Sequence, residues 1–411
     1  MIQNIYKKIT ESRLPWLLFY LGFTIELGMV IVDKSNYINP IEGYLFRITF
    51  LLFAGKVLLT RCNWKEWLVI VLLEAVGFVS YRITGKNDII RIVTFVAACK
   101  NIPLKQMMRY AFWVTAAGCM GIILLSVTGI YGAMSLSQDF GRGVSAYEIY
   151  EGAVGMVETR YTLGMGHPNA LSCMFLMVCV MGVYAYFEQL KWYGYLFLLF
   201  LNVGVFWLTD SKTSMLITVA FLVGACVMKY ARRLQERNYV YLLGGLLFLL
   251  CVGFSVDAAA GAVNVRQAEW SRHYGQAYEE SLNIRLLVAV DEKINGRIAS
   301  LTNSEHNDGA LESWRAFSSE NNMTYYFDMG WVKLFYRYGV IPGILYVAVS
   351  LFLLWRLWKA KDACGLVVFV IMAVYTVLEA HLVSAYIGRN FLLLLIGYYG
   401  WTFSSENGIL N

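Results

Sequence analysis

Residues 239–256 read YVYLLGGLLFLLCVGFSV, eighteen residues without a charged side chain. A helix needs about 20 consecutive apolar residues to cross a hydrocarbon core about 30 Å thick. Comparable stretches recur at residues 14–32, 41–60, 67–81, 89–99, 110–131, 170–187, 192–209, 213–228, 339–355, 364–382 and 390–403. We therefore predict an all-α polytopic membrane protein with about 12 transmembrane helices. The range is eleven to thirteen, because residues 89–99 could also form a re-entrant or interfacial segment.

The composition supports this class. Hydrophobic residues make up 58% of the 411-residue chain and charged residues only 15%, whereas soluble domains average about 25% charged residues. The net charge of +6 is no evidence for nucleic acid, because the charges lie at the ends of the apolar stretches. No repeat or second soluble domain is visible, so residues 1–411 are predicted to form one integral membrane domain.

Positive charge indicates the orientation. The loops on one side of the predicted membrane contain sixteen Lys and Arg residues. The loops on the other side contain seven when the largest loop is left out of the count. Because cytoplasmic loops are enriched in Lys and Arg, both termini are predicted to be cytoplasmic. Two long segments, residues 132–169 and 257–329, then become outer loops, the second large enough for short helices.

Neither outer loop contains any of the eight cysteines. Disulfides are therefore not expected, and no Cys/His spacing resembles a zinc site. No acidic cluster is well placed outside the membrane either, so we predict chemistry without a metal or other cofactor.

The first candidate motif is ETRYTLGMGHPN at residues 158–169, which contains Arg160, His167 and Asn169. Its two glycines allow a tight turn, and Pro168 suits the first turn of a helix. Asn169 could satisfy backbone groups there. A simple helix-entry turn without chemistry explains this pattern equally well.

The second motif is the short hairpin LTDSKTS at residues 208–214. Charges at such a depth are costly unless they meet a partner or water. Lys212 could bind an anionic substrate at the membrane surface, or it could simply pair with Asp210.

The large loop and the segment after it supply the third set. Arg297 follows a turn-forming Asn-Gly pair, and residues 325–328 read YYFD, which places Tyr325 and Tyr326 before Asp328. Lys333 and Arg337 are four residues apart and would share one face of a helix. Most charges in so long a loop are expected to be solvated.

The last candidates are Glu379, His381 and Arg389, near the outer ends of the final two stretches. Polar groups at such positions are often functional, although mutual pairing is an equal explanation. Together the cations predict a lipid with a phosphorylated head group as the substrate. The many Tyr and Trp residues could form interfacial belts or stack on sugars, and composition does not separate these uses.

These motifs, in this order, resemble the polysaccharide polymerase (Wzy) family of the O-antigen ligase/polymerase superfamily. The resemblance extends from about residue 67 to the last helix and includes GVIPG at residues 339–343. Two positions depart from the family pattern. Lys212 stands where relatives often have arginine, and Asp328 stands where related ligases have histidine before the corresponding helix.

The resemblance implies a C-type glycosyltransferase-like fold in the cytoplasmic membrane of a bacterium. It implies transfer of a growing glycan from undecaprenyl pyrophosphate to a lipid-linked repeat unit, for capsule, exopolysaccharide or O-antigen. Arg160, Lys212, Arg297 and Arg389 would stabilise the leaving group, and Asp328 or His167 would act on the acceptor. Membrane lipid, a flippase and a chain-length regulator would be partners. The alternatives are a lipid-oligosaccharide flippase, an O-antigen-type ligase or protein glycosyltransferase, and a membrane component without turnover.

Overall fold

The computed structural model describes residues 12–35, 37–140, 156–276, 281–303, 307–318 and 327–401. These ranges contain fifteen α-helices. Eight of them are long and apolar enough to cross a membrane: α2 (Leu14–Lys34), α4 (Trp64–Thr84), α6 (Leu104–Val127), α8 (Pro168–Ala185), α9 (Trp192–Thr209), α10 (Lys212–Tyr230), α12 (Asn238–His273) and α15 (Val340–Ala360). The chain is thus a multi-pass, mainly α-helical membrane protein.

Four shorter helices occupy the remaining predicted stretches: α3 (Glu42–Leu58), α5 (Asp88–Ala98), α16 (Ala363–Leu378) and α17 (Leu392–Trp401). At 1.5 Å per residue, α5 and α17 are roughly 16 and 15 Å long, about half of the hydrocarbon thickness. The prediction of about twelve spans is therefore confirmed for eight helices. The other four are helical as predicted but fall short of the spanning criterion.

Helix α12 corrects the predicted boundary of the large outer loop. The apolar stretch ends at residue 256, but the helix continues to His273 and has 36 residues. Small side chains explain the extension: Ala258, Ala262 and Val265 are fully buried against α13 (Leu282–Lys293). The loop predicted at residues 257–329 therefore begins as a helix, and α13 is one of the short helices expected within it.

The smaller of the two predicted outer loops also contains regular structure. Strands β1 (Ser135–Asp139) and β2 (Val157–Tyr161) form an antiparallel hairpin in which Ser135 lies opposite Tyr161. The remaining helices are α11 (Arg232–Gln235) and α14 (Gly330–Tyr338), with 3-10 turns at Ala299–Leu301, Leu311–Ser313 and Ile387–Arg389.

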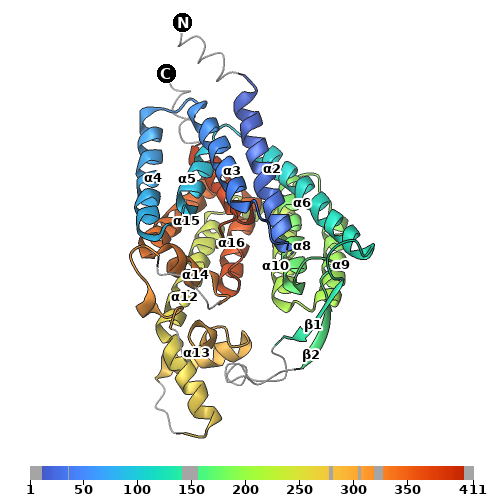
Figure 1. Cartoon of the computed structure of the whole chain (residues 1–411), viewed down its shortest axis with the longest axis vertical. Coiled ribbons are helices and arrows are strands. Elements are labelled where there is room, and N and C mark those ends of the chain that lie inside the picture. The colour runs from blue at the N-terminus through green and yellow to red at the C-terminus, as the bar shows by residue number, and fades with distance from the viewer. Residues whose placement is uncertain are drawn as a thin grey trace.

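Figure 1 shows how these elements are arranged along the long axis. Helix α2 begins and α17 ends near the same end of the molecule, at the top of the view. The hairpin, α13 and the extension of α12 lie at the opposite end, called here the loop end. Both predicted outer loops therefore lie together and away from the termini, which agrees with the predicted alternation of the chain.

An irregular segment, residues 379–391, connects α16 to α17. Its backbone is satisfied by other parts of the chain: Arg91 Nη1 donates to the carbonyl of Ala385 (2.9 Å), and the Tyr338 hydroxyl donates to the carbonyl of Ser384 (3.2 Å). Non-helical backbone at membrane depth is tolerated where protein surrounds it. This segment carries three of the predicted polar residues, so its path places them.

Candidate functional site

The turn that presents Arg297 is held by a buried carboxylate. Asn295 and Gly296 have positive φ values of 59° and 69°, which allow the tight turn predicted from Asn-Gly. Asp291 is fully buried, and its two oxygens accept the backbone N–H groups of Ile298 (2.6 Å) and Ala299 (3.0 Å). Arg297 is therefore attached to a rigid piece of backbone.

Arg297 lies between two acidic side chains. Its Nη2 donates to Glu379 Oε1 at 2.9 Å, and its Nη1 lies 3.7 Å from Asp328 Oδ2. That Nη1 is buried and makes no hydrogen bond. Burial lowers the pKa of the guanidinium, but Glu379 and Asp328 more than offset this effect, so the pKa of Arg297 is raised. The group stays charged while one of its nitrogens lacks a hydrogen-bond acceptor.

Arg160 approaches the same region from β2. Its buried guanidinium donates to Glu158 (2.7 Å) and lies 3.9 Å from the ring centre of Phe140. The Phe140 ring in turn packs edge-on against His167 at 5.8 Å. Phe140 is thus the spacer between two predicted catalytic residues.

His167 caps the N-terminus of α8, and Pro168 is the first residue of that helix, as predicted. The preceding turn is tight, with φ values of 47° at Leu163 and 82° at Gly164. The cap is His167 Nδ1, which accepts the N–H of Asn169 at 3.2 Å. The sequence predicted that Asn169 would satisfy backbone groups at this turn. In the structure the side chain of His167 has this role, and Asn169 supplies the N–H group.

The protonation state of His167 follows from this contact. Burial lowers its pKa, and Arg160 and Lys34 lower it further against an opposing effect of Asp328. The ring is therefore neutral near pH 7. Because Nδ1 accepts a hydrogen bond, the proton of the neutral ring is on Nε2. His167 can donate a hydrogen bond through Nε2 but has no free basic nitrogen.

Lys34 is a member of this site that the sequence interpretation missed. It is the last residue of α2 and lies close enough to His167 and Glu379 to interact with both electrostatically. Within the described ranges it forms no ion pair. The available signal was its position: a lysine at the loop end of the first apolar helix.

We call these six residues the central cluster: Lys34, Arg160, His167, Arg297, Asp328 and Glu379. With Glu158, three cations face three carboxylates, so the cluster is close to neutral. An anionic ligand that binds a guanidinium of the cluster must therefore displace a carboxylate from it, whereas Lys34 has no ion pair to give up within the described ranges. Asp328 is the weakest partner, because its side chain is 42% exposed and its contact is the longest. Its displacement would free Arg297 Nη1 for the ligand and release a carboxylate beside it.

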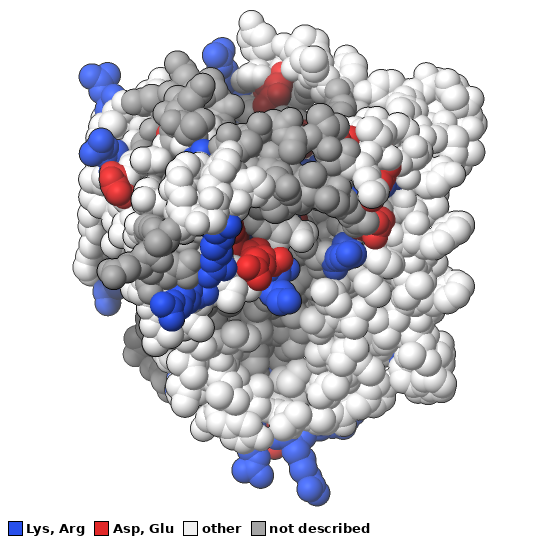
Figure 2. All heavy atoms as spheres, turned by 90° about the horizontal axis from the view of Figure 1, so that it is seen from below, with Lys and Arg blue, Asp and Glu red and all other residues white. Residues whose placement is uncertain are grey.

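Figure 2 shows the loop end of the molecule. Basic and acidic side chains lie next to each other near the middle of this face, beside a hollow between larger uncharged areas.

Other predicted residues lie outside the cluster. Lys212 is exposed at the start of α10 and forms no ion pair with Asp210 among the described contacts. Asn169 is half-buried beside the cap. His381 is buried, and its Nε2 lies 3.0 Å from Met177 Sδ. Tyr325 and Tyr326 lie outside the described residues.

Three predicted substrate-binding cations are embedded between helices. Arg389 pairs with Asp33 of α2, and Arg337 pairs with Asp88 of α5 at 2.7 Å. Lys333 is buried within α14. In this structure Arg337 joins α14 to α5, and Arg389 joins the irregular segment to α2.

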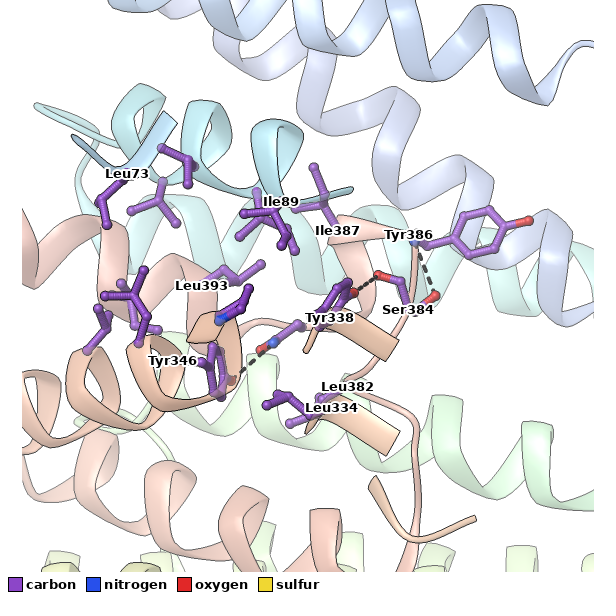
Figure 3. Close-up of a pocket in the computed structure, with 18 residues that line it drawn as sticks. Leu73, Ile89, Leu334, Tyr338, Tyr346, Leu382, Ser384, Tyr386, Ile387 and Leu393 are labelled. Carbon is purple, nitrogen blue, oxygen red and sulfur yellow. Dashed lines mark hydrogen bonds between the residues drawn. The ribbon is translucent and has the colours of Figure 1, made fainter. Parts of the chain in front are cut away.

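Chain neighbours of these ion-paired residues, Ile89, Tyr338 and Asn390, belong to the lining of an apolar groove, which Figure 3 shows. It is lined by α4, α5, α14, α15, α17 and the irregular segment, and it has a volume of about 120 Å³. Its polar atoms come mainly from Tyr338, Tyr346, Ser384 and Asn390, which are joined in pairs by hydrogen bonds. From Pro342 to Val349 it follows α15 for roughly 10 Å at 1.5 Å per residue.

No group of three His, Cys, Asp or Glu side chains that could hold a metal ion occurs in the described ranges. The expectation of chemistry without a metal stays a prediction. Comparison of the chain with protein-family models, with curated proteins and with solved structures finds no match.

Proposed function

We propose that this protein is a polysaccharide polymerase at the outer face of the bacterial cytoplasmic membrane, with its termini in the cytoplasm. It would transfer a growing glycan from undecaprenyl pyrophosphate to a hydroxyl group of a lipid-linked repeat unit. The observation that carries the proposal is the position of Arg297 between Glu379 and the partly exposed Asp328.

The reaction needs two groups that the central cluster supplies. The acceptor hydroxyl attacks the anomeric carbon, the bond from that carbon to the diphosphate oxygen breaks, and the acceptor proton leaves. Arg297 and Lys34 would stabilise the charge that develops on the diphosphate, because fixed cations in a water-poor site act most strongly on developing charge. Asp328 would take the proton, since it is the exposed carboxylate of the cluster and His167 has no free basic nitrogen.

The groove is suited to the first isoprene units of the donor. The irregular segment joins the two parts of such a site: Glu379 at its start contacts Arg297, and Ser384, Tyr386 and Ile387 line the groove. A lipid chain in the groove would enter from lipid while its diphosphate stayed at the loop end. This arrangement fits a substrate that is apolar at one end and anionic at the other.

The packing below the cluster favours an enzyme over a flippase. Cys173, Met177 and Tyr375 are buried there and, with His381, fill the space between α8 and α16. A flippase needs a polar path for the head group, and these side chains leave none at this place. A ligase would share the chemistry but would attach finished chains to another acceptor.

The test is complementation of a deletion strain, with the length of the surface polysaccharide as the readout. Wild type is expected to restore long chains, and Arg297→Ala is expected to leave single repeat units on the lipid. Arg272→Ala is the matched control, because Arg272 belongs to the same outer region but is 47% exposed and pairs with Glu292. Repeat units that accumulate on the cytoplasmic side would indicate a flippase, and long chains that fail to attach would indicate a ligase.

A further inference from the structure

A polar hollow, separate from the apolar groove, lies on the extension of α12. Val263, Arg266, Gln267 and Trp270 line one wall, and Thr302, Asn303 and Asn307 line the other. The helical residues have the spacing i, i+3, i+4 and i+7, so they form a single stripe along the helix. The volume is about 230 Å³, many times the 10 to 15 Å³ that one water needs on the same measure.

The position of Trp270 separates the two uses of tryptophan that composition left open. Trp270 lies fourteen residues beyond residue 256, where the apolar stretch ends, or roughly 21 Å along the helix. That distance takes it past the interfacial layer, in which belts of Trp and Tyr form. Its side chain is nevertheless 37% exposed, and its ring packs against that of Tyr274 at 5.1 Å.

The chemistry of the lining matches a sugar ring. An exposed indole offers an apolar face to the C–H groups of a pyranose. Three carboxamides and a guanidinium supply donors and acceptors for its hydroxyl groups. Among the described residues, the lining contains no carboxylate and Arg266 forms no ion pair.

We propose that this hollow binds a sugar residue of the growing glycan, away from the bond being formed. The inference rests on the proposed function and deepens it. Thr302 follows Arg297 by five residues, and the turn between them packs on α12. The hollow and the central cluster are therefore held by one short, rigid segment, so that the same chain can occupy both. A bound chain would remain on the protein between successive transfers.

The experiment measures binding without turnover. Full-length protein in lipid nanodiscs is titrated with oligosaccharides of one to four repeat units, released by mild acid from the lipid-linked pool of the producing cells. We expect saturable binding that Trp270→Ala weakens at least tenfold and Trp270→Phe less than threefold, because phenylalanine retains an apolar face. Arg266→Ala is expected to weaken it about fivefold. Trp192→Ala is the control, an exposed tryptophan at the start of α9.

Two results of the titration would overturn the inference: no saturable binding by wild type, or equal affinity in wild type and Trp270→Ala. Either result leaves the proposed function intact if polymer formation still depends on Arg297. Conversely, the wild-type protein could bind oligosaccharides as expected while Arg297→Ala leaves the polymer in cells unchanged. That combination would contradict the polymerase proposal alone. In cells, Trp270→Ala is expected to shorten the polymer, and unchanged length would also contradict the inference.

Discussion

Arg91 and Arg297 are both guanidinium groups held by a glutamate at 2.9 Å, yet their surroundings differ. Arg91 lies inside the bundle, where it and Glu26 are 2% and 0% exposed. It also donates to the carbonyl of Ala385 and lies 3.7 Å from the centre of the Phe46 ring. Arg297 lies at the loop end and has a second acidic partner, Asp328, that is partly exposed.

The difference separates a structural cation from a cation that is available to a ligand. Arg91 connects α2, α5 and the irregular segment, and a ligand could reach it only if the helices moved apart. Arg297 could exchange Asp328 for an anion without any change in the helices. The comparison predicts that substitutions at Arg91 act on folding and that substitutions in the central cluster act on the reaction.

The largest effect is expected for Arg91→Ala. Removal of one partner leaves the other charge buried and alone, which typically costs about 3–5 kcal/mol. We expect a large loss of folded protein, measured as the monodisperse yield and the thermal midpoint in detergent. Arg47→Ala in α3 is the control, because Arg47 is exposed. A stable but inactive Arg91→Ala protein would place Arg91 in the site and remove the distinction.

The next effect is expected for Asp328→Asn. The amide keeps the size of the side chain but cannot take the proton from the hydroxyl of the acceptor sugar. General bases typically increase the rate about 10²–10⁴-fold. The transfer rate should fall within that range while the thermal midpoint stays near that of wild type. A transfer rate that remained normal would move the role of base to another group.

A smaller effect is expected for Asp291→Asn, which acts through the Arg297 turn. One of the two N–H groups that Asp291 binds would lose its acceptor, at a cost of about 1–3 kcal/mol. Because the turn carries Arg297, kcat should fall more than the apparent affinity for the donor. Ser300→Ala is a comparison in the same turn, since its hydroxyl only donates to the carbonyl of Arg297. Equal effects of both changes on kcat would argue against a specific role of Asp291.

The smallest effect concerns His167 and pH. Its pKa is lower in the folded protein than its ordinary value of 6.5, so the unfolded chain binds the proton more tightly. The contribution of His167 to the stability is therefore complete above about pH 6.5, and it is lost as the pH decreases through the folded pKa. His167→Asn keeps a capping acceptor without a titrating group, so its thermal midpoint should fall less than that of wild type as the pH decreases from 7 to 5. His167→Ala should lose about 1 kcal/mol at pH 7.5, and equal pH dependence of the midpoint in wild type and His167→Asn would contradict this assignment.

The positions of the helices could be read from the sequence, because apolar stretches are a local signal. The extension of α12 was missed because Asp257 interrupts the apolar run, although Ala258, Ala262 and Val265 continue at helical spacing. Contacts between distant residues were less accessible. Asp88 and Arg337 are 249 residues apart in the chain, and Asp33 and Arg389 are 356 apart. No local pattern shows that these arginines are paired.

Within the site, Arg297, His167, Arg160 and Asp328 were identified from local motifs because turns with Gly, Asn and Pro are local as well. Their partners Glu158 and Phe140 were not, since partners are chosen by the fold. The near-neutral charge of the cluster is a consequence of those partners. A count of cations in the sequence therefore suggested a more positive site than the one that forms.

A continuous helix also fixes a distance. Because α12 runs without a break from Asn238 to His273, it would hold Trp270 at a constant distance from the apolar stretch. Seven residues inserted after Asp257 would lengthen the helix by about 10 Å while rotating it by only about 20° from the original face. If a glycan must span the distance from the central cluster to Trp270 before it is retained, such an insertion would change the number of sugar units at which retention begins. The length of α12 would then influence the length of the product.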